Sequence, residues 1–157
     1  MIVESTRFGR LDVHEEALIT FPSGIIGFPK SSRYVILDHT RDVPFKWLQS
    51  VDEGRLAFVI MDPAVFKSDY HVQVDPDTLA EIGASDLDGL ICFVILTIPS
   101  ADPATVTANL RGPVVVNERT RQAKQLILAD ELPTRYPVFA QRVQAPTATP
   151  VLTACTL

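Results

Sequence analysis

Residues 107–117 read TANLRGPVVVN, with an apolar β-forming run on each side of a polar centre. In the first run, which begins at residue 105, apolar and polar residues alternate, and this predicts a half-buried strand. Its inward positions would be Val106, Ala108 and Leu110, and its outward positions Thr105, Thr107 and Asn109. The second run, 114–117, is predicted as a separate strand. No residue in the stretch matches a nucleophile or metal-ligand pattern, so we expect the segment to shape a binding surface.

Short β-branched and aromatic segments recur along the chain and predict strands. These segments are 2–6, 17–21, 34–38, 45–49, 56–61, 90–98, 105–110, 114–117 and 122–128. Three runs, 34–37, 56–61 and 90–96, are apolar without alternation, which indicates strands covered on both faces. We predict an all-β, mainly antiparallel fold, a small closed or partly open β-barrel with one or two short helices.

Helix signals occur at two places, both in the middle of the chain. Residues 75–83 have Asp75 as N-cap, Pro at the first helical position and Gly83 just past the end. Residues 62–66 begin in the same way and predict a single turn. Residues 117–121 are typical of a hairpin connection, because an Asn side chain can close a turn.

The composition divides the chain near Glu131. From residue 132 to the end there are no acidic residues and two basic ones, and the sequence finishes with APTATPVLTACTL. We therefore predict a β-barrel domain over 1–131 and a partly disordered C-terminal extension over 132–157, with residues 143–157 weakly ordered.

The negative charge is concentrated in one window of the sequence. The chain has a net charge of −5, which disfavours direct nucleic-acid binding. Two readings of the acidic window remain open: a solubilising surface, or a surface that steers a basic partner. Nine acids lie between residues 52 and 88, namely Asp52, Glu53, Asp62, Asp69, Asp75, Asp77, Glu81, Asp86 and Asp88.

Patterns that would indicate catalysis or a cofactor are missing from the sequence. The three histidines lack metal-ligand spacing, and no Ser lies in a Gly-x-Ser-x-Gly elbow. Residues 24–27, GIIG, lack the third glycine of a dinucleotide-binding loop. We expect no catalytic residues, no metal and no cofactor. Two cysteines far apart, no signal segment and no apolar run of roughly 20 residues favour the cytoplasm without membrane contact.

Several polar and apolar residues admit two readings. Pro22, Gly24 and Gly27 would bend the chain, while Ile25 and Phe28 are either core residues or exposed anchors. Gln49 lies among apolar residues and must find hydrogen bonds if it is buried. For Asn109 and its neighbours, the alternatives are simple outward polarity of a strand and a place in a recognition rim.

Seven segments, taken in order, resemble the FliW family of flagellar assembly factors over about residues 2–130. They are 21–28 (FPSGIIGF), 44–50 (PF and LQS), 56–59 (LAFV), 69–70 (DY), 93–98 (FVILTI), 107–117 and 125–128 (QLIL). The resemblance implies a small cytoplasmic β-barrel that is not an enzyme. Such proteins bind newly made flagellin as a chaperone, and also bind CsrA, an RNA-binding translational repressor. Flagellin export would free the protein to capture CsrA and so relieve repression of flagellin mRNA.

The resemblance and the charge together give a set of expected partner-binding residues. The set is Phe21, Pro22, Gly24, Ile25, Gly27, Phe28, Gln49, Asp52, Glu53, Asp62, Asp69, Tyr70, Thr107, Asn109 and Leu110. An alternative of a different class is a small-ligand-binding or enzymatic β-barrel with its site at the mouth of the sheet.

Overall fold

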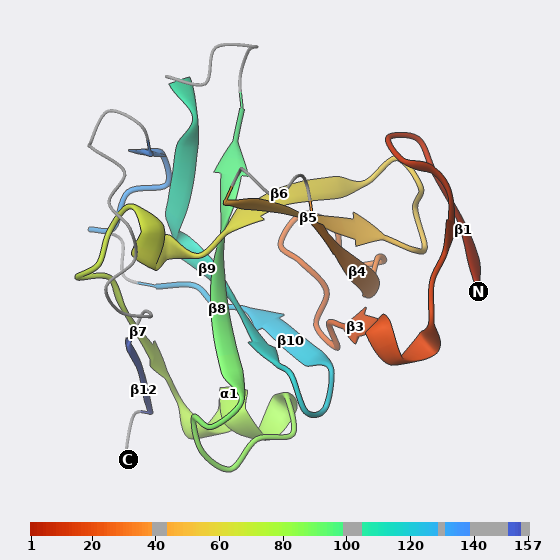
Figure 1. The fold of residues 1–157 in the computed structure, drawn as a ribbon. Helices are drawn as coiled ribbons and strands as arrows, with labels where there is room; N and C mark the ends of the chain where they lie inside the picture. The colour runs from red at the N-terminus through yellow and green to blue at the C-terminus, as the bar shows by residue number, and fades with distance from the viewer. Residues whose placement is uncertain (39–43, 99–104, 129–130, 139–150, 155–157) are drawn as a thin grey trace.

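The computed structural model describes residues 1–38, 44–98, 105–128, 131–138 and 151–154. Its strands are β1 (Ile2–Ser5), β2 (Gly9–Asp12), β3 (Ile19–Thr20), β4 (Arg33–Asp38), β5 (Phe45–Ser50), β6 (Ala57–Met61), β7 (His71–Val74), β8 (Leu90–Thr97), β9 (Thr107–Asn117), β10 (Gln122–Gln125), β11 (Tyr136–Pro137) and β12 (Val151–Ala154). The helices are the 3₁₀ turns η1 (Glu15–Ala17) and η2 (Pro63–Val65) and the α-helix α1 (Pro76–Glu81) (Figure 1).

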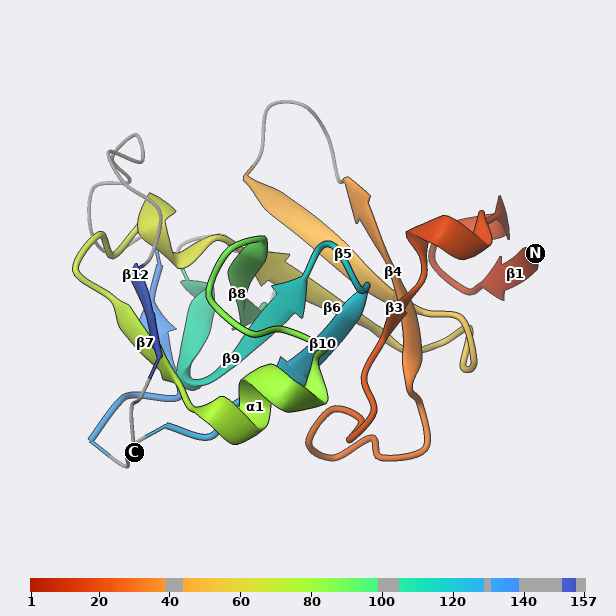
Figure 2. The same ribbon diagram turned by 90° about the horizontal axis from the view of Figure 1, so that it is seen from below.

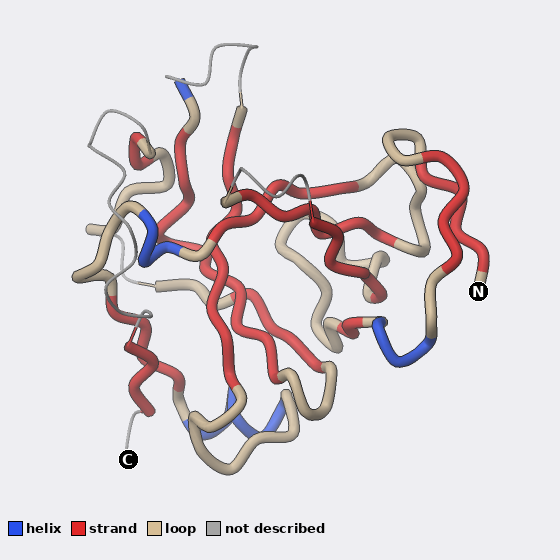
Figure 3. The backbone as a smooth tube through the Cα atoms, viewed as in Figure 1, coloured by secondary structure: helices blue, strands red, loops and turns tan. Residues whose placement is uncertain are grey.

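Seven of the described strands close into a barrel. Their order around the ring is β3, β4, β5, β6, β8, β9 and β10, and β10 pairs with both β9 and β3. The closing contact is a single parallel pair, Gln122 with Thr20, and every other neighbouring pair of the ring is antiparallel. This confirms the predicted all-β, mainly antiparallel barrel, and Figure 3 shows how little helix accompanies it.

Each of the seven barrel strands contributes to one cluster of buried side chains, which fills the interior. Members include Ile19, Tyr34, Leu48, Ile60, Phe93, Val114, Val116 and Ala123. Val59 and Met61 flank Ile60 in sequence but belong to a second cluster, with Val72, Val74 and Leu79. Since neighbouring residues of a strand point to opposite faces, the second cluster covers the outside of the barrel wall. The non-alternating runs are therefore covered on both faces, as predicted.

Strand β9 runs unbroken where the sequence predicted two strands. The polar centre forms an irregular stretch within the strand. There the Asn109 side-chain oxygen accepts hydrogen bonds from the backbone N–H groups of Arg111 and Gly112, at 3.0 and 3.1 Å. The register with β8 shifts at the same level, between Phe93 and Ile95. The predicted buried positions Val106, Ala108 and Leu110 are confirmed as buried, but they belong to the second cluster, on the outside of the barrel wall.

The two helix signals are confirmed. The Asp75 carboxylate accepts a hydrogen bond from the Thr78 N–H at 2.7 Å, and the Asp62 carboxylate accepts one from the Ala64 N–H at 2.9 Å. The predicted strand 17–21 is wrong over its first part, since residues 15–17 form η1. The strand predicted over 122–128 ends at Gln125.

Four short strands were not predicted: β2, β7, β11 and β12. Strand β2 forms a hairpin with β1, and this hairpin packs through Val3 and Val13 against Val35 on the outside of β4 (Figure 2). Strand β12 pairs with β7 and lies within the segment 143–157 that was predicted to be weakly ordered. The rest of that segment lies outside the described residues, and the domain boundary at 131 stays a prediction.

Candidate partner-binding surface

The loop between β3 and β4 bends sharply at its two glycines. Gly24 and Gly27 have φ angles of +69° and +91°, a region that L side chains rarely adopt. At Gly24 a Cβ would also lie 2.9 Å from the Cα of Pro29. The bend confirms the reading of residues 24–27 as a turn in the backbone.

The two alternatives for the apolar residues of this loop resolve differently. Phe21 and Ile25 are buried in the barrel, and Phe21 packs edge-on against Tyr34 with ring centroids 5.2 Å apart. Phe28 is 39% exposed and packs edge-on against Phe58 at 5.5 Å. Phe21 and Ile25 thus hold the loop on the barrel, while Phe28 leaves part of its ring exposed at the surface.

Gln49 is a fully buried hydrogen-bond centre. Its amide nitrogen donates to the backbone oxygens of Ser50, Gly54 and Leu56 at 2.9, 3.2 and 3.2 Å. Its amide oxygen accepts a hydrogen bond from the Ser5 hydroxyl at 2.9 Å. This confirms that Gln49 is hydrogen-bonded when buried. Because it has no exposed surface, Gln49 ties the β5–β6 turn to the β1–β2 hairpin and offers no contact of its own to a partner.

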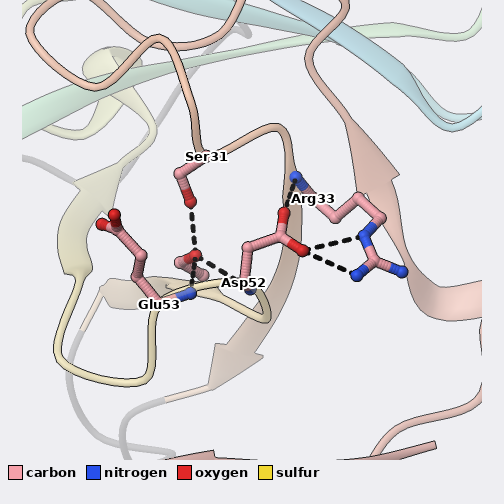
Figure 4. Close-up of polar contacts among 5 residues, drawn as sticks. Ser31, Arg33, Asp52 and Glu53 are labelled. Carbon is pink, nitrogen blue, oxygen red and sulfur yellow. Dashed lines mark hydrogen bonds and ion pairs between the residues drawn. The ribbon is translucent and has the colours of Figure 1, made fainter.

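The β5–β6 turn, residues 51–56, is held from one side by hydrogen bonds to Ser50; Figure 4 shows Asp52 and Glu53 of this turn. The Ser50 hydroxyl oxygen accepts hydrogen bonds from the N–H groups of Asp52 and Glu53, at 3.2 and 2.9 Å, and lies 2.5 Å from the Ser31 hydroxyl. Asp52 points back toward β4, where its carboxylate accepts hydrogen bonds from the Arg33 backbone N–H at 3.1 Å and from the guanidinium at 3.0 and 2.6 Å. The carboxylate of Glu53 projects away from this pair.

The protonation of Asp52 reflects two opposing effects. Partial burial alone would raise the pKa of its carboxyl group, but the hydrogen bonds and the charge of Arg33 together outweigh it and hold the pKa below its usual value. Asp52 is therefore ionised at neutral pH, with its charge neutralised by Arg33. Glu53 is exposed and has no ion pair among the described residues, so its charge is not neutralised as that of Asp52 is.

A groove lies beside this turn, between the β1–β2 hairpin and the loop that carries Phe28. Its volume is about 640 Å³, and we call it the hairpin groove; it is lined by Glu4, Thr6, Phe28, Glu53, Gly54, Arg55 and Leu56. A neighbouring cavity of about 370 Å³ shares Thr6, Gly54 and Arg55 with it. An apolar ring, carboxylates and a guanidinium thus meet at one opening, which suits a protein surface that carries mixed apolar and charged side chains.

Glu4, Gly54 and Arg55 are groove residues that the sequence reasoning missed. A Cβ at residue 54 would lie 2.0 Å from the backbone oxygen of Glu4, so only glycine lets the hairpin approach the turn this closely. The N–H of Thr6 donates to the Gly54 oxygen at 3.0 Å and fixes the approach. The available signal was the Asp-Glu-Gly turn between two predicted strands.

The remaining predicted site residues lie elsewhere in the fold. Tyr70 is buried, and its hydroxyl donates to the backbone oxygen of Leu110 at 2.5 Å, which joins the η2–β7 loop to β9. Burial also raises the pKa of Tyr70. Thr107 and Asn109 are half-buried on β9. In Figures 1 and 2, η2 and β7 lie across the molecule from the β1–β2 hairpin, so the expected residues form two groups.

The nine acids of residues 52–88 do not gather on one face. They belong to the β5–β6 turn, the η2–β7 loop, and α1 with the loop that follows it, which are separated in Figures 1 and 2. Ion pairs hold four of them: Asp52 with Arg33, Asp69 with Lys67, Glu81 with Lys124, and Asp88 with Arg119. Asp62, Asp75 and Asp86 accept backbone N–H groups. The nine acids therefore do not form a single acidic surface, which was the condition for the window as a whole to steer a basic partner.

The described residues lack two further kinds of reactive site, a metal site and an activated thiol. They contain no group of three or more His, Cys, Asp or Glu side chains placed to hold a metal ion. Burial, with a smaller contribution from Asp62, raises the pKa of the Cys92 thiol to about 12, so this thiol stays protonated and is a poor nucleophile. Among the described helices, none has the length and apolar character needed to cross a membrane.

Comparison with known proteins places the chain in a family. The model of the FliW protein family matches residues 2–138. The flagellar assembly factor FliW of Natranaerobius thermophilus is 36% identical over 140 residues, covering 88% of this chain and 93% of that protein. The protein of the same name from Bdellovibrio bacteriovorus is 36% identical over 145 residues, covering 92% and 82%. A crystal structure of the flagellar assembly factor FliW superposes with a TM-score of 0.81 at 30% identity, covering 91% of this chain and all of that one. The chain belongs to the FliW family of flagellar assembly factors.

Proposed function

We propose that this protein is a cytoplasmic, non-enzymatic flagellar assembly factor that binds flagellin as a chaperone and binds the translational repressor CsrA. Membership of the FliW family over most of the chain carries the proposal. The packed barrel interior supports it, because a wall whose inner face is filled by side chains leaves protein binding to the outer surface.

The hairpin groove is the surface we assign to partner contact. Phe28 offers an exposed aromatic ring, and aromatic residues are enriched among the side chains that dominate binding energies. Glu53 and Glu4 at the same opening suit a basic side chain of a partner. CsrA holds RNA phosphates and is therefore basic, so an acidic groove docked beside its RNA site would weaken RNA binding by repulsion.

Because the other carboxylates of the acidic window are dispersed over the molecule, the electrostatic attraction for CsrA should come from the groove residues alone. The fields of two paired charges of opposite sign nearly cancel at distances larger than their separation. Salt also screens exposed charges beyond the Debye length, which is about 8 Å at physiological ionic strength. Glu53 is exposed and has no ion pair among the described residues, so it should dominate the attraction. We expect the affinity for CsrA to depend on this residue more than on the overall charge.

Isothermal calorimetry with purified CsrA and flagellin from the same organism tests the proposal. Glu53→Lys should weaken CsrA binding by roughly ten-fold, equivalent to about 1.4 kcal/mol. The matched control is Asp77→Lys, which makes the same charge change on α1, where Asp77 is also exposed and has no described ion pair. Equal weakening by the two variants would reject the groove as the CsrA surface, and absence of binding to both partners would reject the function.

The alternative class, a small-ligand-binding or enzymatic barrel, has a candidate site in the hairpin groove. Its volume of about 640 Å³ lies within the usual range of ligand pockets. Native mass spectrometry of the purified protein would reveal a bound small molecule, and such a ligand displaced by CsrA would favour this alternative.

A further inference from the structure

Strand β7 lies outside the barrel sheet and has one sheet partner among the described residues, the C-terminal strand β12. The two strands run side by side in Figures 1 and 2 and are parallel. Four residue pairs set the register: His71 with Val151, Val72 with Leu152, Gln73 with Thr153, and Val74 with Ala154.

β7 is anchored by its own side chains, independently of β12. Val72 and Val74 are fully buried in the cluster that covers the outside of the barrel wall. Directly before the strand, the Tyr70 hydroxyl donates a hydrogen bond to the backbone oxygen of Leu110. Directly after it, the Asp75 carboxylate caps the N-terminus of α1. The edge that β12 covers is therefore a pre-formed row of backbone donors and acceptors, which is the surface that an added strand recognises.

β12 is weakly attached by comparison. It contributes four residues to a two-stranded parallel pair, and parallel pairing is slightly less stable per residue than antiparallel pairing. It also lies beyond residue 138, where the match to the family ends. The barrel closes through β10 and β3 without any contribution from β12.

We propose that the edge of β7 is a strand-accepting site for an extended, uncharged polypeptide segment, and that β12 occupies it as an intramolecular competitor. The occupant defines the chemistry of the partner segment: residues 151–154, VLTA, have uncharged side chains, and two of the four are β-branched. β12 belongs to the same chain, separated from Val138 by twelve residues in the sequence, so a partner segment competes with an intramolecular strand. Short flexible linkers in general give intramolecular segments effective concentrations in the millimolar range. A partner segment must compete with this effective concentration to displace β12 from β7, so the tail sets the lowest partner concentration or affinity at which the partner binds.

This site is separate from the hairpin groove and does not depend on the identity of the partners proposed above. The test uses the full chain with Leu152→Pro and Thr153→Pro. In a parallel pair alternate residues of a strand bond to one neighbour, so proline at two successive positions removes at least one donor from the ladder. The matched control, Thr147→Pro with Ala148→Pro, adds two prolines to the tail outside β12. The probe is a labelled synthetic peptide with the sequence of residues 147–157, carrying Ser in place of Cys155.

We expect fluorescence anisotropy to show the peptide binding the Leu152→Pro/Thr153→Pro variant at least ten-fold more tightly than the wild-type or control chains. Equal binding to all three chains, or binding to none, would overturn the proposal. In the wild-type chain, millimolar peptide should speed amide hydrogen exchange at residues 151–154 while leaving residues 114–116 protected. Exchange at 151–154 that does not respond to the peptide would contradict the proposal without relying on any variant.

Discussion

At the scale of single residues, the strongest constraint on the candidate site is a buried side chain that touches no partner. The Gln49 amide nitrogen donates hydrogen bonds to three backbone oxygens in and beside the β5–β6 turn, and its oxygen accepts one from a hydroxyl of β1. The turn and the β1–β2 hairpin both border the hairpin groove. The sequence indicated that Gln49 needs hydrogen bonds. It could not identify them, because Ser5 is 44 residues distant in the chain and the contact depends on how the hairpin packs.

Gln49→Leu should therefore destabilise the fold and loosen the groove. The replacement removes the donor contacts of the amide nitrogen and leaves the buried Ser5 hydroxyl without its acceptor, which should cost about 2–3 kcal/mol of unfolding free energy. The oxygens of Gly54 and Leu56 keep their backbone N–H donors. Gln125→Leu is the matched control: Gln125 is half-buried and bonds to Ile26 and Gly112, where water can replace it, so a loss of about 1 kcal/mol or less is expected. Urea denaturation at pH 7 measures both, and losses of equal size would show that Gln49 is not the centre of the network.

The Arg33–Asp52 pair gives a pH dependence whose sign follows from the lowered pKa of Asp52. Its contribution is fully present above the unfolded-state pKa of about 3.9 and is lost as the pH falls through the lower folded-state value. The difference in unfolding free energy between wild type and Asp52→Asn should thus be largest near neutral pH. It should shrink toward zero as the pH falls below 4. Because Arg33 is nearly half exposed, we expect less than about 1 kcal/mol. A gap that widens as the solution is acidified would contradict the assigned direction.

At the scale of elements, long apolar segments were predictable and short ones were not. β6 and β8 carry runs of five or more apolar residues that hydrophobic burial alone identifies. β7 and β12 have four residues each, and both are strands because of the neighbour they meet, which a local pattern does not contain. β9 was split in two because its polar centre resembles a turn, whereas Asn109 supplies side-chain hydrogen bonds that let the strand continue.

The β3–β4 loop provides a test of how its glycines shape the Phe28 surface. Gly24→Ala should destabilise the protein by more than Gly27→Ala. Both replacements force an L residue to positive φ, at about 1–2 kcal/mol each, but a Cβ at Gly24 also meets Pro29, while a Cβ at Gly27 has nothing within 4 Å. Thermal unfolding of the two variants makes the comparison. Identical midpoints would mean that the contact with Pro29 does not constrain the loop.

At the scale of the whole molecule, the structure changes how charge contributes to binding. The sequence places nine acids in one window, and a linear count left open whether they form one negative surface. Folding sends them to three regions and pairs four with cations, because the window spans β6, η2, β7 and α1, which point in different directions from the barrel. The fold class and the family were therefore accessible from sequence, whereas the convergence of charged groups required coordinates.

The partner switch also requires a property of the molecule as a whole: one copy of the protein should not bind flagellin and CsrA at the same time. If binding of one partner weakens binding of the other, linkage requires the effect to be reciprocal. The most direct measurement is calorimetric titration of CsrA into this protein with and without saturating flagellin. We expect flagellin to reduce the apparent affinity for CsrA at least ten-fold, and CsrA to reduce the affinity for flagellin by the same factor. An affinity for CsrA that is unchanged by saturating flagellin would contradict the partner switch.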